Sequence, residues 1–211
     1  MEALFIKAII ANDYRAISYL SLKYVIPFEL LNTAFIMASE LGHSTIIDHL
    51  LLLGADIHTQ DDLPLIEACK NGHIDVVVKL LNNNANVHTL SGLALILSAL
   101  YGHYHIVIFL IMFGADPNVQ NGLALLVAIE AGHIDIVGTL LLSGVDPNIH
   151  NGEALLCAIS GRHLEIVRLL LTFNVDLNIR NGLPFQLASQ TMNFEIYLLL
   201  MNFKYNKKHG S

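Results

Sequence analysis

The sequence predicts an all-α protein in which seven helix–turn–helix repeats stack on one another. The first observation is a Gly-His pair that recurs every 30 residues and is degraded only in its last copy. The pairs are Gly42-His43, Gly72-His73, Gly102-His103, Gly132-His133 and Arg162-His163. The second observation is a composition with 54% hydrophobic and only 14% charged residues, which suits short helices buried on several sides. A fixed period of this length is the signature of a repeat array, in which each copy contacts only its neighbours.

Two further positions keep the same register through all seven repeats. The first predicted helix carries a small residue that lets helices approach closely: Ala8, Ala38, Ala68, Ser98, Ala128, Ala158 and Ala188. The second predicted helix always carries a leucine: Leu20, Leu50, Leu80, Leu110, Leu140, Leu170 and Leu200. Helices of about nine or ten residues are marginal alone in water, so each pair must be stabilised by burial against the next.

The repeat 121–150 shows the predicted elements in order. A first helix is predicted over about residues 123–131, with its core face at Leu125, Ala128 and Ile129. Gly132 follows as a left-handed C-cap. A second helix is predicted over about residues 134–143 and is apolar along one broad stripe. Residues 144–148 have turn chemistry, and Asn151-Gly152 opens the next repeat as a tight turn.

These boundaries divide the chain into repeats 1–30, 31–60, 61–90, 91–120, 121–150, 151–180 and 181–210. No linker or low-complexity tract interrupts the register, so we expect one domain over residues 1–210. The first and last repeats are expected to be caps, since Asn12-Asp13 and Met192-Asn193 replace the Gly-His pair. Residues 204–211 are expected to form a polar tail that frays.

The repeats resemble the ankyrin repeat. The matching residues are clearest at Gly72-His73-Ile74-Asp75-Val76-Val77 and at Gly114-Ala115-Asp116-Pro117-Asn118, and the resemblance covers essentially the whole chain. It implies an ankyrin-type solenoid. The usual repeat has about 33 residues, so the missing residues predict shortened hairpin loops. The short repeats are similar in style to those of ankyrin proteins from intracellular bacteria or large DNA viruses, which implies an effector that acts in the host cytoplasm.

Metal binding and catalysis are not expected. Equivalent histidines of adjacent repeats would lie roughly 8–10 Å apart, whereas zinc needs its ligand nitrogens at about 2.0–2.1 Å from one centre. We therefore expect no cofactor, and we expect the repeated histidine to close the turn between the two helices by hydrogen bonding. No nucleophile or phosphate-binding motif is present, so the protein is not expected to be an enzyme. Cys69 and Cys157 are predicted to be buried thiols in a reducing compartment, which favours the cytoplasm.

Nucleic-acid binding and membrane insertion are also not expected. The net charge is −7, and no lysine or arginine occurs from Leu80 to Gly161, whereas a groove that follows a phosphate backbone needs clustered cations. Residues 91–115 contain no charged side chain and are long enough to span a bilayer. Gly102-His103 nevertheless lies in phase with the other repeats, so this segment is predicted to form a helix, a turn and a helix.

The resemblance implies a protein-interaction module that binds through the concave face, which the first helices and the loops form. The variable first-helix positions give a candidate site with an apolar, aromatic centre and a charged rim: Glu67, Lys70, Leu97, Leu100, Tyr101, Val127 and Glu130. A partner with an apolar anchor and basic residues would fit this surface. One alternative is that neighbouring repeats merely cover these positions. Another is that an apolar patch on the second helix binds the partner, through Ile108, Phe109, Met112 and Phe113.

Two functional roles remain open from the sequence. The chain is expected to be a scaffold or adaptor that works by binding. The alternative is that it is the recognition part of a larger effector or enzyme assembly whose catalytic part lies in another chain.

Overall fold

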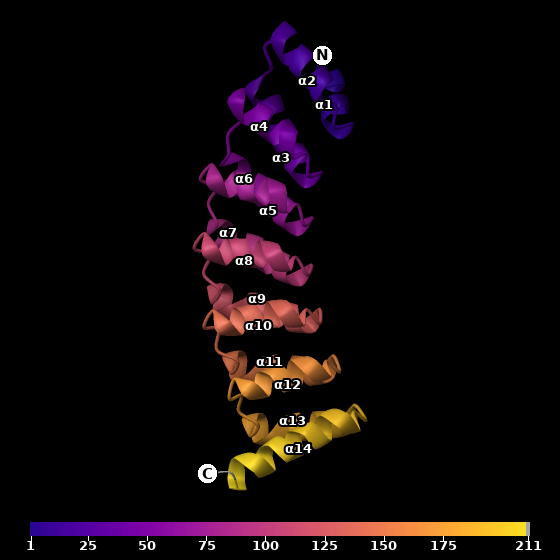
Figure 1. Cartoon of the computed structure of the whole chain (residues 1–211), viewed down its shortest axis with the longest axis vertical. Helices are drawn as coiled ribbons and strands as arrows, with labels where there is room; N and C mark the ends of the chain where they lie inside the picture. Colours follow the sequence, from indigo (N-terminus) through magenta and orange to yellow (C-terminus); the bar gives the residue numbers. More distant parts are fainter. Residues whose placement is uncertain (210–211) are drawn as a thin grey trace. The chain divides into compact units, whose positions relative to one another are not determined.

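The structure, a computed structural model, describes residues 1–209, and every regular element in that range is an α-helix (Figure 1). The helices are α1 (Glu2–Ile10), α2 (Tyr14–Lys23), α3 (Phe28–Glu40), α4 (Ser44–Leu52), α5 (Thr59–Lys70), α6 (Ile74–Asn82), α7 (Thr89–Leu100), α8 (Tyr104–Met112), α9 (Val119–Glu130), α10 (Ile134–Leu142), α11 (Ile149–Ser160), α12 (Leu164–Thr172), α13 (Ile179–Gln190) and α14 (Phe194–His209). The predicted all-α, helix–turn–helix class is confirmed.

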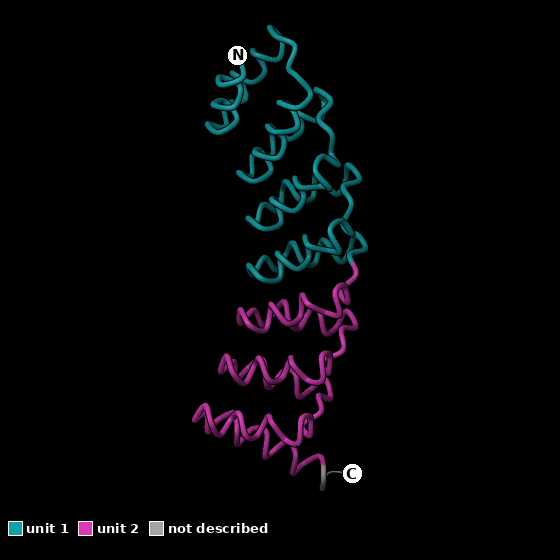
Figure 2. Tube along the Cα trace, turned by 180° about the vertical axis from the view of Figure 1, so that it is seen from behind, with its two compact units in different colours: residues 1–115 teal, residues 116–211 magenta. Residues whose placement is uncertain are grey.

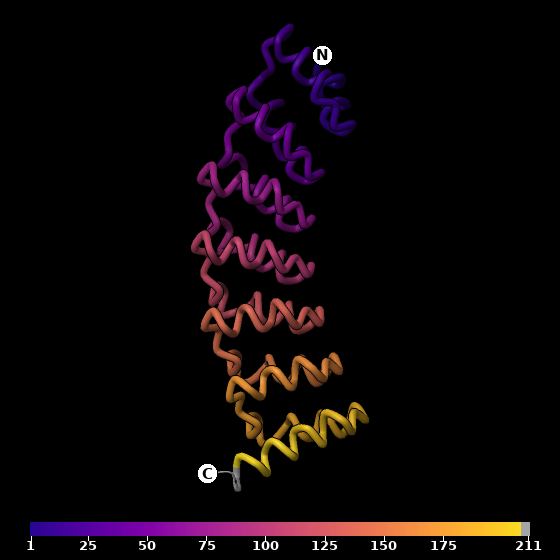
Figure 3. Tube along the Cα trace, viewed as in Figure 1, coloured from indigo at the N-terminus to yellow at the C-terminus, as the bar shows by residue number. Residues whose placement is uncertain are grey.

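The chain forms two compact units, Met1–Ala115 and Asp116–Ser211 (Figure 2). The first contains α1–α8 and the second contains α9–α14. Within each unit the odd-numbered helices pack in a row, α3 on α5 on α7 and α9 on α11 on α13, and α4, α6 and α8 form a second row. Figure 3 shows these helix pairs succeeding one another in chain order. The single domain over residues 1–210 stays a prediction.

The core of each repeat contains the residues that the period singled out. The second-helix leucine is buried in all seven repeats, from Leu20 to Leu200, and so is the small first-helix residue. Ser98 is the one hydroxyl at the latter position, and it donates a hydrogen bond of 2.8 Å to the carbonyl of Ala94 in its own helix. A buried hydroxyl that is satisfied in this way costs little, so serine replaces alanine there.

The Gly-His pair links adjacent repeats. The backbone N–H of His73 closes the turn on the carbonyl of Ala68 at 3.0 Å, whereas its ring Nε2 lies 2.8 Å from the carbonyl of Glu40 in the preceding repeat. The ring nitrogen must donate, because a carbonyl only accepts. Nε2 of His103 donates in the same way to the backbone carbonyl of Lys70, at 2.9 Å. The predicted hydrogen-bonding role is therefore confirmed, but the ring joins two repeats instead of closing its own turn.

The glycine of each pair is required for two reasons. Gly42 and Gly72 have φ angles of 76° and 79°, as a left-handed cap requires. A Cβ on Gly42 would lie 2.5 Å from Nδ1 of His73, and one on Gly72 would lie 2.6 Å from Cε1 of His103. The glycine of one repeat therefore makes room for the histidine of the next.

The loop before the first helix of repeats 3 to 7 is a left-handed turn instead of a hairpin. Three consecutive residues have positive φ at the start of α5, α7, α9, α11 and α13; in α11 they are His150, Asn151 and Gly152. The right-handed part of each of these helices therefore begins about four residues after the helix's first residue, near the predicted start. The tight turn predicted at Asn151-Gly152 agrees with these angles, and no strand occurs in residues 1–209.

Repeat 3 fills this turn with charged residues. Asp61 and Asp62 stand where most repeats have Asn-Gly or Ser-Gly, and Asp62 is buried. Its Oδ1 accepts hydrogen bonds from the backbone N–H of Asn86 at 2.8 Å and from Nδ1 of His58 at 3.0 Å. The buried carboxylate thus ties the loop of one repeat to the loop of the next.

The end of the chain differs from expectation. Residues Lys204–His209 continue α14, which has 16 residues where α12 has nine. The expected fraying is therefore not seen up to His209, and residues 210–211 of the predicted tail lie outside the described residues. None of the described helices is both long enough and apolar enough to cross a bilayer. The uncharged segment 91–115 contains the helices α7 and α8 with a turn between them.

Candidate functional site

In the first compact unit, five of the predicted site residues lie on two adjacent helices. Glu67 and Lys70 lie on α5, Leu97 and Leu100 lie on α7, and Tyr101 is the C-cap residue of α7. Because α5 and α7 pack side by side, the structure brings these residues onto neighbouring elements. We call this group the α5–α7 surface.

Charge on the α5–α7 surface centres on one ion pair. The ammonium of Lys70 lies 3.0 Å from Oε2 of Glu67. This hydrogen bond and the charge of Glu67 raise the pKa of Lys70, and the charges of Glu40 and Tyr101 add to the effect. Glu40 and Tyr101 are therefore close enough to influence Lys70. Since Glu67 already balances Lys70, the charge of Glu40 leaves this surface with an excess of negative charge.

Tyr101 is the most exposed of the three apolar residues on this surface. Its side chain is 51% exposed, whereas Leu97 and Leu100 are half-buried. The ring of Tyr101 lies 6.4 Å from the ring of His103, which the hydrogen bond to Lys70 holds in place. The two leucines are thus partly covered, whereas the tyrosine is accessible.

A hollow of about 280 Å³ lies between the starts of α6 and α8. Its lining includes Ile74, His103, Tyr104 and His105. The rings of Tyr104 and His105 meet edge to face at 5.3 Å. An aromatic or aliphatic side chain fits such a lining better than a charged one.

In the second compact unit the predicted residues are Val127 and Glu130. Val127 is half-buried on α9, and Glu130 is exposed at the end of that helix. Oε1 of Glu130 lies 3.8 Å from Sγ of Cys157, and Oε1 of Glu153 lies 3.9 Å from the same sulfur. Glu153 also pairs with Arg180 at 2.7 Å. The sequence did not single out Glu153 and Arg180, which are separated by 27 positions and show no local signal.

The environments of the two cysteines differ from each other. Cys69 is fully buried, as predicted, and burial raises its pKa to about 12. The prediction that Cys157 is buried is wrong, because the residue is only half-buried. Partial burial and then the charges of Glu153 and Glu130 raise its pKa to about 11. Both thiols are therefore protonated at neutral pH and are poor nucleophiles.

The alternative patch on α8 is partly accessible. Ile108 and Phe109 are half-buried, whereas Met112 and Phe113 are exposed, Met112 at 72%. The exposed part of the patch therefore lies at the C-terminal end of the helix.

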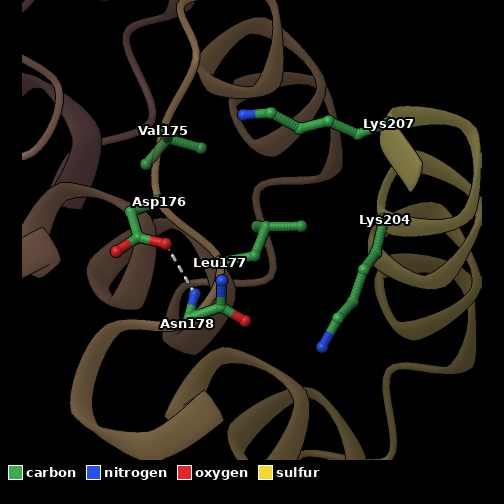
Figure 4. Close-up of a pocket in the computed structure, with 6 residues that line it drawn as sticks. All are labelled: Val175, Asp176, Leu177, Asn178, Lys204 and Lys207. Carbon is green, nitrogen blue, oxygen red and sulfur yellow. Dashed lines mark hydrogen bonds between the residues drawn. The ribbon is translucent and has the colours of Figure 1, made fainter. Parts of the chain in front are cut away.

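A cation-lined cleft of about 290 Å³ lies between α14 and the loop before α13 (Figure 4). Lys204 and Lys207 extend from α14 toward Asp176 and Asn178 of this loop. Asp176 is engaged locally, since its Oδ1 accepts the backbone N–H of Asn178 at 2.8 Å. The ammonium of Lys204 lies 4.8 Å from the ring centroid of Phe185. Among the residues that the structure describes, no group of three or more His, Cys, Asp and Glu side chains is arranged to hold a metal ion.

Comparison with known proteins bears on the fold. A family model described as ankyrin repeats (three copies) matches residues 34–121 and 125–209, well over half of the chain. The crystal structure of the human ASB11 ankyrin repeat domain is similar, with a TM-score of 0.71 and 22% sequence identity over 80% of this chain and 82% of that one. At this identity the likeness shows the fold alone. A search of curated protein sequences finds no match.

Proposed function

Because the chain belongs to the ankyrin repeat family, whose repeats are generally protein–protein interaction modules, we propose that it is a non-catalytic module that binds a protein or peptide partner on the α5–α7 surface. The observation that carries the proposal is the accessible ring of Tyr101 beside the charged group of Glu40, Glu67 and Lys70. Binding energy at protein interfaces concentrates in a few aromatic and arginine residues.

The tyrosine is well placed to be such an anchor. The ring of His103 lies beside the ring of Tyr101, and a hydrogen bond to the preceding repeat fixes that histidine. A ring that is already ordered loses little conformational entropy when a partner covers it. The hollow between the starts of α6 and α8, which His103 also lines, would take an apolar side chain of the partner.

The charges favour a basic partner. Glu67 neutralises Lys70, and the carboxylate of Glu40 forms no ion pair with any described residue. An arginine or lysine of the partner would meet Glu40 at the edge of the surface, where such contacts mainly raise the association rate and specificity. The expected ligand is therefore a segment with an apolar anchor and a neighbouring basic residue.

Val127 and Glu130 are proposed as a separate contact area in the second compact unit. Glu130 is exposed, and its neighbours are a protonated thiol and the Glu153–Arg180 pair. This area would add negative charge and little apolar surface, so we expect it to contribute less to affinity than Tyr101 does.

The test compares three variants in affinity capture from candidate host lysates, followed by titration of the captured partner. Tyr101→Ala is expected to weaken binding by about 2 kcal/mol, or roughly 30-fold, and Glu40→Lys to slow association. Tyr19→Ala is the matched control, because Tyr19 is similarly exposed on α2. Unchanged binding in both Tyr101→Ala and Glu40→Lys would reject the α5–α7 surface.

The patch on α8 is the second candidate site, and the exposure of Met112 and Phe113 favours it. Met112→Ser and Phe113→Ser remove exposed apolar surface without touching the core. Loss of capture in these variants, with Tyr101→Ala unaffected, would move the proposed binding site to α8. A captured enzyme that depends on this chain for its target would favour the alternative role as the recognition part of a larger assembly.

We also propose a cytoplasmic location, and a role as a host-cell effector if the source is an intracellular bacterium or a large DNA virus. The two free cysteines and the style of the short repeats support this. Imaging of the tagged chain in host cells, compared with its fractionation, tests the location. Recovery in a membrane or secreted fraction would count against it.

A further inference from the structure

The last helix carries an exposed apolar stripe along its length. Phe194, Leu198, Met201 and Tyr205 have exposed fractions between 45% and 73%. Their spacing of four, three and four residues places them on one side of a helix. Ile196 and Leu200, on the opposite side, are fully buried. α14 is thus apolar on two sides, of which only one packs against the rest of the second compact unit. We call the exposed side the α14 stripe.

A further repeat of the same kind does not fit beside α14. In α5, α7 and α11 the first helix offers its neighbour two buried apolar residues, for example Ile66 and Cys69 in α5. The corresponding residues of α13 are Gln186 and Ser189, and both are exposed and polar. A serine can be buried at the second position, as Ser39 is with its hydroxyl bonded to the carbonyl of Phe35. A stacked repeat would, however, also bury Gln186 and deprive its side-chain amide of water. The occupant of the α14 stripe must therefore contact α14 and leave α13 solvated, as a single helix would.

The order of side chains along the stripe indicates which helix that is. From either end it reads aromatic, aliphatic, aliphatic, aromatic, with the same spacing. A two-fold axis that crosses the middle of α14 would set Phe194 against Tyr205 of a second copy, and Leu198 against Met201 of that copy. A surface that matches itself under a two-fold rotation is what an isologous dimer requires.

The same two-fold axis sets the orientation. An axis that crosses the middle of α14 makes the two helices antiparallel and opposes their helix dipoles. A parallel pair would instead set each stripe residue against its own copy. Lys204 and Lys207 line the cleft next to α13 and take no part in the pairing. We propose that α14 pairs with α14 of a second copy of this chain to form an antiparallel dimer.

The first test is the mass in solution. By light scattering, the wild-type chain is expected at about twice its monomer mass of 23.2 kDa. Leu198→Glu with Met201→Glu is expected to give the monomer mass and to raise the dimer dissociation constant at least 100-fold. Leu142→Glu is the matched control, because Leu142 is an exposed leucine of α10 in the same compact unit.

Three outcomes of this test overturn the proposal. They are a wild-type chain that is monomeric at its highest soluble concentration, a dimer that survives both α14 changes, and a dimer that Leu142→Glu disrupts equally. Circular dichroism checks that the double variant is folded, and Leu198→Ser with Met201→Ser replaces it if it is not. Because the readout is self-association, the result is independent of the partner proposed for the α5–α7 surface.

The second test fixes the orientation. In an antiparallel pair the two copies of residue 194 lie about 16 Å apart along the axis, since a helix rises about 1.5 Å per residue. Phe194→Cys alone should therefore form no disulfide, whereas a mixture of Phe194→Cys and Tyr205→Cys chains should form one. Cys157→Ser serves as the background. A disulfide in Phe194→Cys alone would show a parallel pair and overturn the antiparallel dimer.

Discussion

Junctions between interior repeats differ from those at the first and last repeats in the residues that occupy the two positions of the Gly-His pair. At Gly42 and Gly72 the missing side chain accommodates the next repeat's histidine, whose ring bonds a backbone carbonyl. In the first and last repeats the histidine is replaced by Asp13 and by Asn193. Each of these accepts a backbone N–H three residues ahead, at 3.0 and 3.1 Å, and so caps its own helix.

The glycine position changes together with its partner. Arg162 replaces the glycine of repeat 6, and the facing residue of the next repeat is Asn193, which is smaller than histidine and bonds elsewhere. Arg162 keeps the left-handed φ of 59° and donates to the carbonyl of Thr191 at 3.1 Å. The comparison shows that the two residues of one Gly-His pair contact different neighbours. The glycine faces the next repeat, and the histidine ring faces the preceding repeat.

The largest effect is expected for Gly72→Ala. The new Cβ must adopt positive φ and also displaces the ring of His103, so the free energy of unfolding should fall by about 3 kcal/mol. Gly144→Ala is the control, because Gly144 has a φ of 93° but nothing within 4 Å of a Cβ. The control should lose only about 1 kcal/mol. Urea denaturation followed by circular dichroism measures both, and equal losses would refute the role of the facing histidine.

Removal of the histidine ring should have the next largest effect. His103→Ala loses a hydrogen bond of 2.9 Å and the packing against Gly72, so we expect about 1–2 kcal/mol of destabilisation. The bond from His163 to the carbonyl of Glu130 is longer, at 3.4 Å, and His163→Ala should cost about half as much. Hydrogen exchange of the amides in α5 and α9 compares the two sites. The reverse order would contradict the geometry.

A double-mutant cycle tests whether Arg162 and Asn193 are coupled. Asn193→His should be destabilising alone, because the cap on α14 is lost and the ring meets the side chain of Arg162. Arg162→Gly should restore an interior type of junction, with a coupling energy of about 1 kcal/mol in favour of the pair. Additive effects in thermal unfolding would mean that the two positions changed independently.

The smallest effect is expected at the first junction. Nε2 of His43 is buried and has no hydrogen-bond partner among the described residues, and Asn12 stands where repeats 2 to 5 have glycine. Asn12→Gly should give the ring of His43 the room that the ring of His73 has at Gly42, and stabilise the protein by about 0.5–1 kcal/mol. A decrease in the unfolding midpoint would show that the asparagine serves a purpose that the glycine cannot.

Much of the fold could be predicted because its signal is periodic. The second helix of repeat 5, predicted over about residues 134–143, is observed at Ile134–Leu142. The role of the histidine ring could not be placed, because the acceptor carbonyl lies 33 residues away in another repeat. The positive φ of Leu90 and Arg180 also has no residue signal, since neither side chain favours that conformation.

In the candidate sites, too, the sequence predicts what the repeat period determines and misses what depends on contacts between repeats. Glu67, Lys70 and Tyr101 lie together because equivalent positions of adjacent repeats are neighbours, which the period alone predicts. The Glu153–Arg180 pair and the half-burial of Cys157 depend on side-chain contacts between repeats, and composition does not show them. The extension of α14 was missed because its lysines suggested a solvated tail, although the stripe from Phe194 to Tyr205 has helical spacing.

The glycine of one repeat faces the histidine of the next repeat. This arrangement has a consequence for how the number of repeats can change. A duplicated or deleted block of 30 residues regenerates a matched junction on each side, wherever its edges fall, as long as it lies within repeats 2 to 5, residues 31–150. Copying repeat 6 would instead set Arg162 against the ring of a second His163, which needs empty space. The gene for such a protein can therefore gain or lose internal cassettes by unequal recombination without compensating mutations, while its two outermost blocks stay unique.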